Sequence, residues 1–135
     1  LSVSFLPFLF TLTTTALTTT PAFAQTAGKP DFNFEELMEN VELNLNEMQA
    51  SISLQDQADA IRRSREIRDA FHKIELFFAS WGIAEDAVTS AQQYQQRSDR
   101  IIALINAADF NGAYDLSVEH SSHCKSCHDN YKPLP

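Results

Sequence analysis

The chain has 135 residues and carries 18 acidic against 10 basic side chains, which gives a formal net charge of −8 at pH 7. This acidity argues against nucleic-acid binding, which needs clusters of Lys and Arg to neutralise phosphates. Behind an apolar leader, the length suits one domain with a single hydrophobic core.

The leader has the features of a secretory signal. Residues 1–20 carry no charge and are rich in Leu, Phe and Thr, and they run into Ala-Phe-Ala at residues 22–24. This small-x-small pattern is typical of a signal-peptide cleavage site. The strongly apolar part, residues 3–12, is shorter than the roughly 20 apolar residues of a membrane span. We therefore predict a signal peptide at residues 1–24 that is cleaved on export to the periplasm. A retained membrane anchor is the alternative.

The mature chain, residues 25–135, has the pattern of an all-α protein. It contains 3 glycines, each where a helix would begin or end, and no stretch shows the sustained alternation of a strand. Apolar residues recur instead at spacings of three and four. The predicted helices span about residues 31–53, 56–81, 84–108 and 111–132. Because the connections between them are short, we expect an antiparallel up-down-up-down four-helix bundle.

The first predicted helix begins at Asp31, a residue type that caps helix N-termini. Its apolar residues form a seam on one face: Met38, Val41, Leu45, Met48 and Ile52. Glutamates cover the opposite face: Glu35, Glu36, Glu39, Glu42 and Glu47. We expect this helix to bury the apolar face in the bundle and to expose the acidic one to solvent.

The second and third predicted helices carry seams with many small residues. The seam of the second, which ends before Gly82, consists of Ala60, Ser64, Ile67, Phe71, Ile74, Phe78 and Trp81. The seam of the third consists of Ala84, Ala87, Ala91, Tyr94, Ser98, Ile101, Ile105 and Ala108. Helices with such seams either pack very closely or leave space between them for a large, flat group.

The fourth predicted helix, which Pro133 terminates, holds both cysteines of the chain in the sequence Cys-Lys-Ser-Cys-His at residues 124–128. This is the signature of haem c attachment, in which the two thiols bond covalently to the haem vinyl groups and the histidine ligates iron. On a helix, Cys124, Cys127 and His128 occupy positions i, i+3 and i+4. The three side chains are therefore expected to project from one patch.

Three other readings of the cysteine pair remain open. A disulfide between Cys124 and Cys127 would close only a tiny loop and strain the helix. A thioredoxin-like dithiol would require a strand-to-helix context that the sequence lacks. A metal clip is the strongest rival, because His120 and His128 lie near the same helix face as the thiols and all four are zinc-compatible ligands. Such sites, however, normally take ligands from two chain segments.

The ending CKSCHDNYK, on the last helix of an acidic four-helix chain with a signal peptide, resembles that of the cytochrome c′ family, the class II c-type cytochromes. The resemblance implies one covalently attached haem c, with Cys124 and Cys127 as the thioether positions and His128 as the proximal iron ligand. It also implies that Tyr131 packs beside the haem. Lys132 stands where the family usually has Arg, and these two side chains are not interchangeable beside an anionic or polar group.

Two behaviours share the bundle in this family, and the residue on the distal side of the iron separates them. With a methionine ligand on the first helix, the iron is six-coordinate and the protein carries electrons to and from redox partner proteins. With an apolar residue there, the iron is five-coordinate and binds the gases NO or CO. Counting back along the first seam places Met38 at this position, whereas Met48 lies nearer the helix end. Methionine at a seam position is also ordinary core filler.

The sequence therefore predicts a periplasmic monohaem electron carrier, not an enzyme, with Met38 as sixth ligand. A five-coordinate gas-binding haem protein and a non-haem metal-binding helical protein are the alternatives. We expect His120 to line the site without ligating iron, and His123 and His72 to lie at the surface. Family members often dimerise through the first helix, so a homodimer is compatible with the resemblance, although the acidic face of this helix opposes it.

Overall fold

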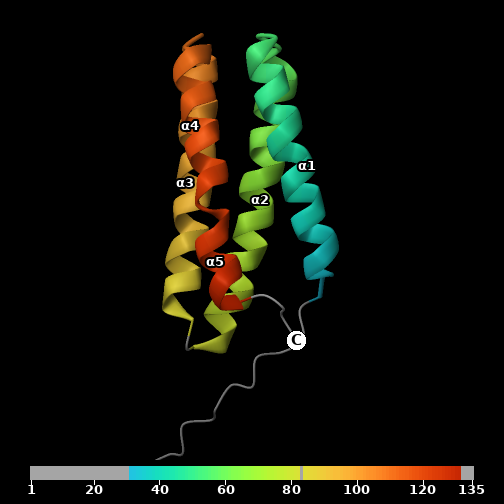
Figure 1. Ribbon diagram of the computed structural model, residues 1–135, viewed down its shortest axis with the longest axis vertical. Coiled ribbons are helices and arrows are strands. Elements are labelled where there is room, and N and C mark those ends of the chain that lie inside the picture. The colour runs from blue at the N-terminus through green and yellow to red at the C-terminus, as the bar shows by residue number, and fades with distance from the viewer. Residues whose placement is uncertain (1–30, 83, 132–135) are drawn as a thin grey trace, which may run out of the picture.

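The computed structural model describes residues 31–82 and 84–131, and within them every regular element is a helix. The helices are α1 (Phe34–Ser53), α2 (Gln57–Trp81), α3 (Glu85–Asn106), α4 (Phe110–Ser122) and α5 (Cys124–Tyr131). Successive long helices run in opposite directions, and α5 continues the course of α4 (Figure 1). The predicted all-helical four-helix bundle is confirmed. The predicted signal peptide, Lys132 and Pro133 lie outside the described residues.

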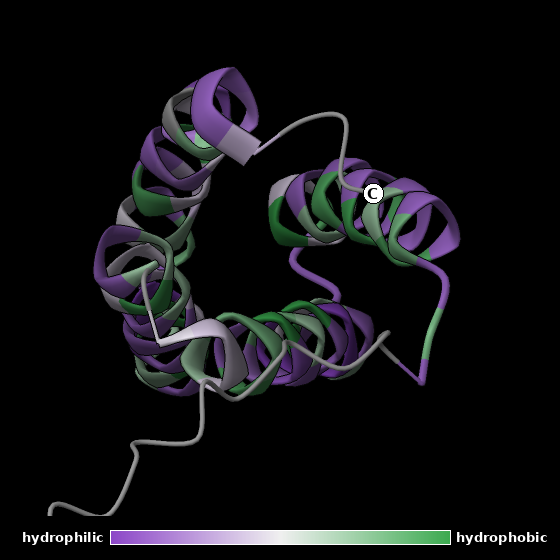
Figure 2. Cartoon of the chain, turned by 90° about the horizontal axis from the view of Figure 1, so that it is seen from below, coloured by the Kyte–Doolittle hydropathy of each residue, from purple (hydrophilic) through white to green (hydrophobic). Residues whose placement is uncertain are grey.

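The bundle closes into a ring, because α1 packs against α2, α2 against α3, α3 against α4, and α4 against α1. Seen from one end, the helices surround a common axis (Figure 2). In the part of the chain that the structure describes, no helix combines the length and the apolar character that a membrane span requires.

The helix ends follow from local capping. Asn33 caps α1, since its side-chain oxygen accepts hydrogen bonds from the backbone N–H groups of Glu35 and Glu36 at 2.9 and 3.2 Å. The predicted cap at Asp31 was therefore two residues too early. At the end of α2, Gly82 adopts the left-handed conformation with φ 68°, which glycine reaches without steric cost. This agrees with the predicted end of the second helix.

The predicted seams form the core except at the end of the third, because α3 ends at Asn106 and Ala108 is exposed with φ 59°. All but one of the residues of the first seam are buried, the exception being Met38, which is half-buried against the core. Small residues are buried along the facing seams: Ala60, Ser64, Ala84, Ala87, Ala91, Ser98, Ala113 and Ser117. They let the helices approach closely around a few large residues, of which Tyr94, Phe78 and Met48 are the largest fully buried ones.

We expect Ile101→Ala to lower the free energy of unfolding by about 2 to 5 kcal/mol, because Ile101 is fully buried on α3 and its loss leaves a cavity. Urea denaturation monitored by far-UV circular dichroism measures the change. Ile102→Ala is the matched control, since Ile102 is the same residue type on the same helix but only half-buried. Equal losses for the two variants would contradict the placement of the α3 seam.

The fourth helix differs from the prediction of one continuous helix over residues 111–132, because it is interrupted at His123 between α4 and α5. The backbone oxygen of Glu119 would accept the N–H of His123 in an unbroken helix. Instead it accepts the Ser122 hydroxyl at 2.7 Å and His123 Nδ1 at 2.8 Å. Side chains that bond to nearby backbone groups in this way compete with the helical hydrogen bond. The interruption therefore has a local chemical cause in Ser122 and His123.

Candidate functional site

The two cysteines and the histidine of the motif lie together on α5. Cys124 and Cys127 are free thiols and half-buried, and Cys124 packs against the hydrophobic core. His128 is exposed. The helical spacing predicted for the three residues is thus present, but their surroundings differ: the thiols lie at the edge of the core while the imidazole faces solvent.

Tyr131 attaches α5 to the start of α3 and the end of α2. Its hydroxyl donates a hydrogen bond to the Asp86 carboxylate, and its ring lies 4.9 Å from that of Phe78. The hydrogen bond to Asp86 raises the pKa of Tyr131 to about 12 and lowers the pKa of Asp86. Tyr131 therefore holds the helix that carries the motif in place.

A small open pocket of about 190 Å³ lies beside this attachment. Its lining residues come from the first turns of α3 and from α5: Asp86, Ala87, Ser90, Cys127, Asn130 and Tyr131. Burial raises the pKa of the Cys127 thiol, and the negative charge of Asp86 and the neighbouring Cys124 add to this effect. Cys127 is therefore protonated at neutral pH, which does not suit an activated redox thiolate.

An aromatic cluster covers this end of the bundle. Ring centroids are 4.7 Å apart for Phe34 and Phe77 and 5.1 Å for Phe77 and Trp81. Phe78 joins the cluster to Tyr131 on α5. The indole N–H of Trp81 is buried and has no hydrogen-bond partner. Phe34 was not predicted to lie in this region, although its position two turns before the seam residue Val41 marks it as inward-facing.

A second group, which we call the Tyr94 cluster, consists of Phe71, Tyr94, Arg97 and His120. The rings of Phe71 and Tyr94 stack at 4.1 Å with an angle of 9°, and the His120 ring stands nearly perpendicular to Tyr94 at 4.7 Å. The Arg97 guanidinium lies over the Tyr94 ring, 5.5 Å from its centroid. His120 was predicted to line the site, and the structure shows that it is fully buried.

The polar atoms of this cluster lack partners. Neither ring nitrogen of His120 has a hydrogen bond, and the Tyr94 hydroxyl has none. The Cys124 thiol lies beside the hydroxyl and, after burial, is the main reason that the pKa of Tyr94 is raised. Burial, with the charges of Arg97 and His123, lowers the pKa of His120 to about 4. A buried polar group without a partner costs about 1 to 3 kcal/mol. These groups therefore lower the free energy of unfolding of the haem-free chain.

The lowered pKa of His120 makes the haem-free chain sensitive to acid. The unfolded chain binds this proton near pH 6.5 and the folded chain near pH 4. The free energy of unfolding therefore keeps its full value above pH 6.5. It falls as the pH decreases towards 4, by up to about 3 kcal/mol. Urea denaturation as a function of pH measures this loss.

We expect His120→Leu to remove this part of the acid sensitivity, because leucine does not titrate. His72→Gln is the matched control. His72 is exposed on α2, so its replacement removes an imidazole of the same type without disturbing the core. A His120→Leu profile that parallels the wild type would contradict the assignment.

The two methionines have different surroundings. Met38 is half-buried on α1 and packs against the core. Met48 is fully buried, and the Ser64 hydroxyl donates a hydrogen bond to its sulfur at 3.0 Å. Met48 is thus an integral core residue, whereas Met38 lies at the edge of the core.

The remaining histidines agree with their predicted surface positions, since both His72 and His123 are exposed. Among residues 31–82 and 84–131, no three His, Cys, Asp or Glu side chains are placed to share a metal ion. The four side chains of the metal clip considered above do not form such a group here: His120 is buried in the core while His128 is exposed to solvent.

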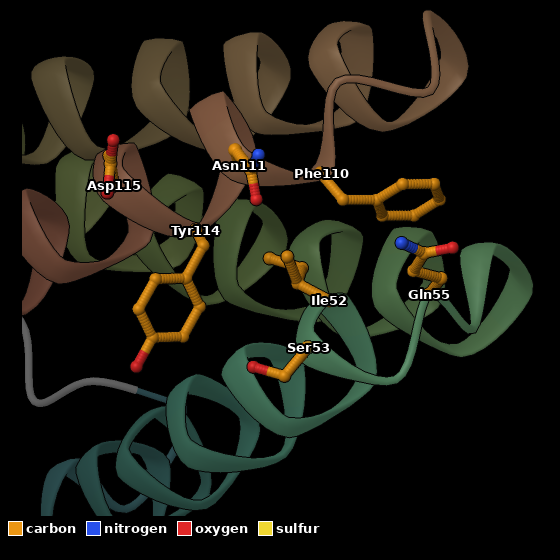
Figure 3. A pocket seen from close by; sticks show the side chains of 7 residues that line it. All are labelled: Ile52, Ser53, Gln55, Phe110, Asn111, Tyr114 and Asp115. Atoms are coloured by element: carbon orange, nitrogen blue, oxygen red, sulfur yellow. The ribbon is translucent and has the colours of Figure 1, made fainter.

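A larger pocket of about 390 Å³ lies at the opposite end of the bundle, where α1 ends and α4 begins (Figure 3). Its lining residues are Ile52, Ser53, Gln55, Phe110, Asn111, Tyr114 and Asp115. Phe110 and Tyr114 project from α4 towards the end of α1 (Figure 3). No residue of the α5 motif takes part in this pocket, so the two sites are separate.

No protein-family model, no curated protein and no solved structure matches this chain.

Proposed function

We propose that the protein is a periplasmic monohaem c-type cytochrome of the class II type, which transfers single electrons between redox partner proteins. One haem c would be attached through Cys124 and Cys127, and His128 and Met38 would ligate its iron. One observation carries the proposal: both cysteines of the chain and a histidine occupy positions i, i+3 and i+4 of one helix at the edge of a four-helix bundle.

The residues present fit a haem in their chemistry. The thiols are free and half-buried, as thioether formation at the edge of a core requires. The bundle interior also contains buried polar atoms without partners, on Trp81, Tyr94 and His120. A bound group with hydrogen-bond acceptors would relieve part of this cost. When bound, haem supplies a reversible one-electron iron couple whose potential depends on its axial ligands and on burial.

The chain's own residues would hold and shield this group. Tyr131 fixes the end of α5 through Asp86 and Phe78, which limits the positions open to the neighbouring Cys127. His128 is exposed, so its side chain retains the rotational freedom to turn its imidazole towards a ligand. The aromatic cluster around Trp81 adds half-buried apolar surface at this end of the bundle, and a low-polarity environment tunes a redox centre.

A five-coordinate gas-binding haem protein is the second candidate. The observation that favours it is the contact of Met38 with the hydrophobic core, since a methionine that fills the core leaves the sixth iron position open to NO or CO. The two candidates share the attachment through Cys124, Cys127 and His128 and differ only in the role of Met38.

Visible absorption spectra of the exported protein, oxidised and reduced, with and without carbon monoxide, test the proposal. Electron transfer with an axial methionine predicts a low-spin spectrum, a weak thioether-to-iron charge-transfer band and little response to carbon monoxide. A high-spin spectrum that shifts on carbon monoxide would contradict electron transfer and favour the gas-binding function. A colourless protein would contradict both.

A further inference from the structure

The pocket of about 390 Å³ between the end of α1 and the start of α4 takes no part in the proposed function. Its volume lies within the range of about 300 to 1,000 Å³ that is usual for small-molecule sites. Phe110 and Tyr114 lie one helical turn apart on α4, and their rings stand on either side of Ile52 rather than against each other (Figure 3). The pocket therefore offers two separate aromatic faces to a ligand.

The polar side chains of the pocket are available to a ligand. Within the part of the chain that the structure describes, the side chains of Gln55, Asn111 and Asp115 make no hydrogen bond or ion pair, and all three residues are exposed. An amide both donates and accepts hydrogen bonds, and a carboxylate accepts them. Hydroxyl groups also donate and accept, so a ligand that carries several of them matches this lining.

The charges around the pocket favour a neutral ligand. Asp115 is the one charged residue among the described residues that line it, and its carboxylate repels an anion. The negative end of α1 and the positive end of α4 meet here, so the two helix dipoles oppose each other. A single exposed carboxylate contributes little to the binding of a cation. A purely apolar ligand would remove water from the polar side chains without replacing its hydrogen bonds.

Gln55 provides a separate indication that the pocket is used. It follows the C-cap residue Leu54 of α1 in the left-handed conformation, with φ 56°. Glycine is the usual residue at such a position, because a side chain there is sterically unfavourable. The fold alone would therefore favour glycine, yet the chain has a long polar side chain at the edge of the pocket. Ala108 adopts the same conformation, with φ 59°, after α3 and does not line the pocket.

We propose that this pocket binds a neutral saccharide of two linked pyranose rings. The C–H faces of the two rings pack on Phe110 and Tyr114, since polarised C–H groups are attracted to the negative face of an aromatic ring. Gln55, Asn111 and Asp115 bind the hydroxyl groups. The site goes beyond the proposed function and is independent of it, because no residue of the α5 motif takes part.

Titration of the exported protein with maltose, cellobiose and N,N′-diacetylchitobiose, followed in amide-resolved NMR spectra, tests the inference. We expect at least one disaccharide to shift the signals of residues 52–55 and 110–115 in a saturable way, whereas benzylammonium and benzoate leave them unchanged. A free disaccharide and the end of a longer glycan share this chemistry. Equal affinity for the disaccharide and its tetrasaccharide would identify the first, and tighter binding of the tetrasaccharide the second; either result supports the site.

Tyr114→Ala is expected to weaken binding of that disaccharide by about tenfold, because one of the two aromatic faces is lost. Val118→Ala is the matched control. Val118 lies one turn further along α4, is 48 % exposed and does not line the pocket, so its replacement is expected to change the affinity by less than about twofold.

Gln55→Gly separates binding from stability. Glycine adopts the left-handed conformation without steric cost, so the urea midpoint is expected to rise, while loss of the amide weakens saccharide binding by about fivefold. Ala108→Gly is expected to raise the midpoint in the same way and to leave binding unchanged. A lower midpoint for Gln55→Gly would show that the side chain supports the fold and would overturn its assignment to binding.

Three results would overturn the saccharide site. The first is that none of the three disaccharides shifts the signals of the pocket. The second is that benzylammonium alone shifts them, which would make the pocket a site for an organic cation. The third is that Tyr114→Ala binds the disaccharide as tightly as the wild type. None of these results bears on haem attachment, so the proposed function would stand.

Discussion

Replacing both Cys124 and Cys127 with serine is expected to give a folded chain that carries no covalently attached haem. Serine preserves the size of the side chain but cannot form a thioether, and neither thiol makes a disulfide whose loss would unfold the protein. The haem that remains with the protein after acidic acetone extraction measures the effect. We expect complete loss for the double variant and reduced attachment for each single variant.

Lys125→Ala is the matched control for this experiment. Lys125 lies between the two cysteines, its side chain is 80 % exposed, and its Nζ lies 2.6 Å from a carboxylate oxygen of Asp129. Its replacement changes the motif sequence without touching a thiol or the imidazole, so attachment is expected to remain at the wild-type level. Haem that survives extraction from the double serine variant would contradict the proposed attachment.

Met38→Ala and Met48→Ala are expected to have opposite effects on spectrum and stability. If Met38 ligates iron, its replacement converts the low-spin spectrum to a high-spin one, removes the charge-transfer band and allows carbon monoxide to bind. The stability of the haem-free chain changes little, because Met38 is only half-buried. Visible spectra and urea denaturation of the same samples measure both effects.

Met48→Ala is expected to leave the spectrum unchanged and to cost about 2 to 5 kcal/mol of unfolding free energy, because the side chain is fully buried. The Ser64 hydroxyl keeps its 2.8 Å hydrogen bond to the Ala60 oxygen when the methionine sulfur is removed, so the loss is mainly one of packing. A low-spin spectrum that survives in Met38→Ala but is lost in Met48→Ala would reverse the roles of the two methionines.

The helices could be predicted because their signal is local and repeated. Apolar residues at spacings of three and four place Val41, Leu45 and Ile52 on one face, and burial of that face requires only neighbouring helices. The end of α2 was also predictable, since Gly82 occupies a conformation that favours glycine. The start of α1 was not, because Asp31 and Asn33 are both good caps and only the backbone geometry selects Asn33.

The interruption of the fourth helix could not be read from the same pattern. Apolar periodicity continues through it, while the decisive interactions are the bonds from Ser122 and His123 to the Glu119 oxygen. These side-chain bonds compete with a backbone hydrogen bond of the helix. Which of them forms depends on side-chain rotamers that the sequence does not specify. His128 follows the helical rule in its spacing from Cys124, but spacing alone does not say which residues of a patch are covered, and His128 is exposed.

The candidate site was only partly predictable for a related reason. Cys124, Cys127 and His128 form a contiguous motif, so the sequence alone identifies them. The Tyr94 cluster joins α2, α3 and α4, and no sequence spacing links Arg97 to His120. Its most informative property, the absence of hydrogen-bond partners for buried polar atoms, exists only once the helices are packed.

The mass of the exported protein after denaturation tests the central proposal most directly, because only a covalently attached group remains with the unfolded chain. We predict the mass of the chain plus one haem, with both thiols unavailable to an alkylating reagent. A mass equal to that of the chain alone, with Cys124 and Cys127 both alkylated, would contradict the proposal.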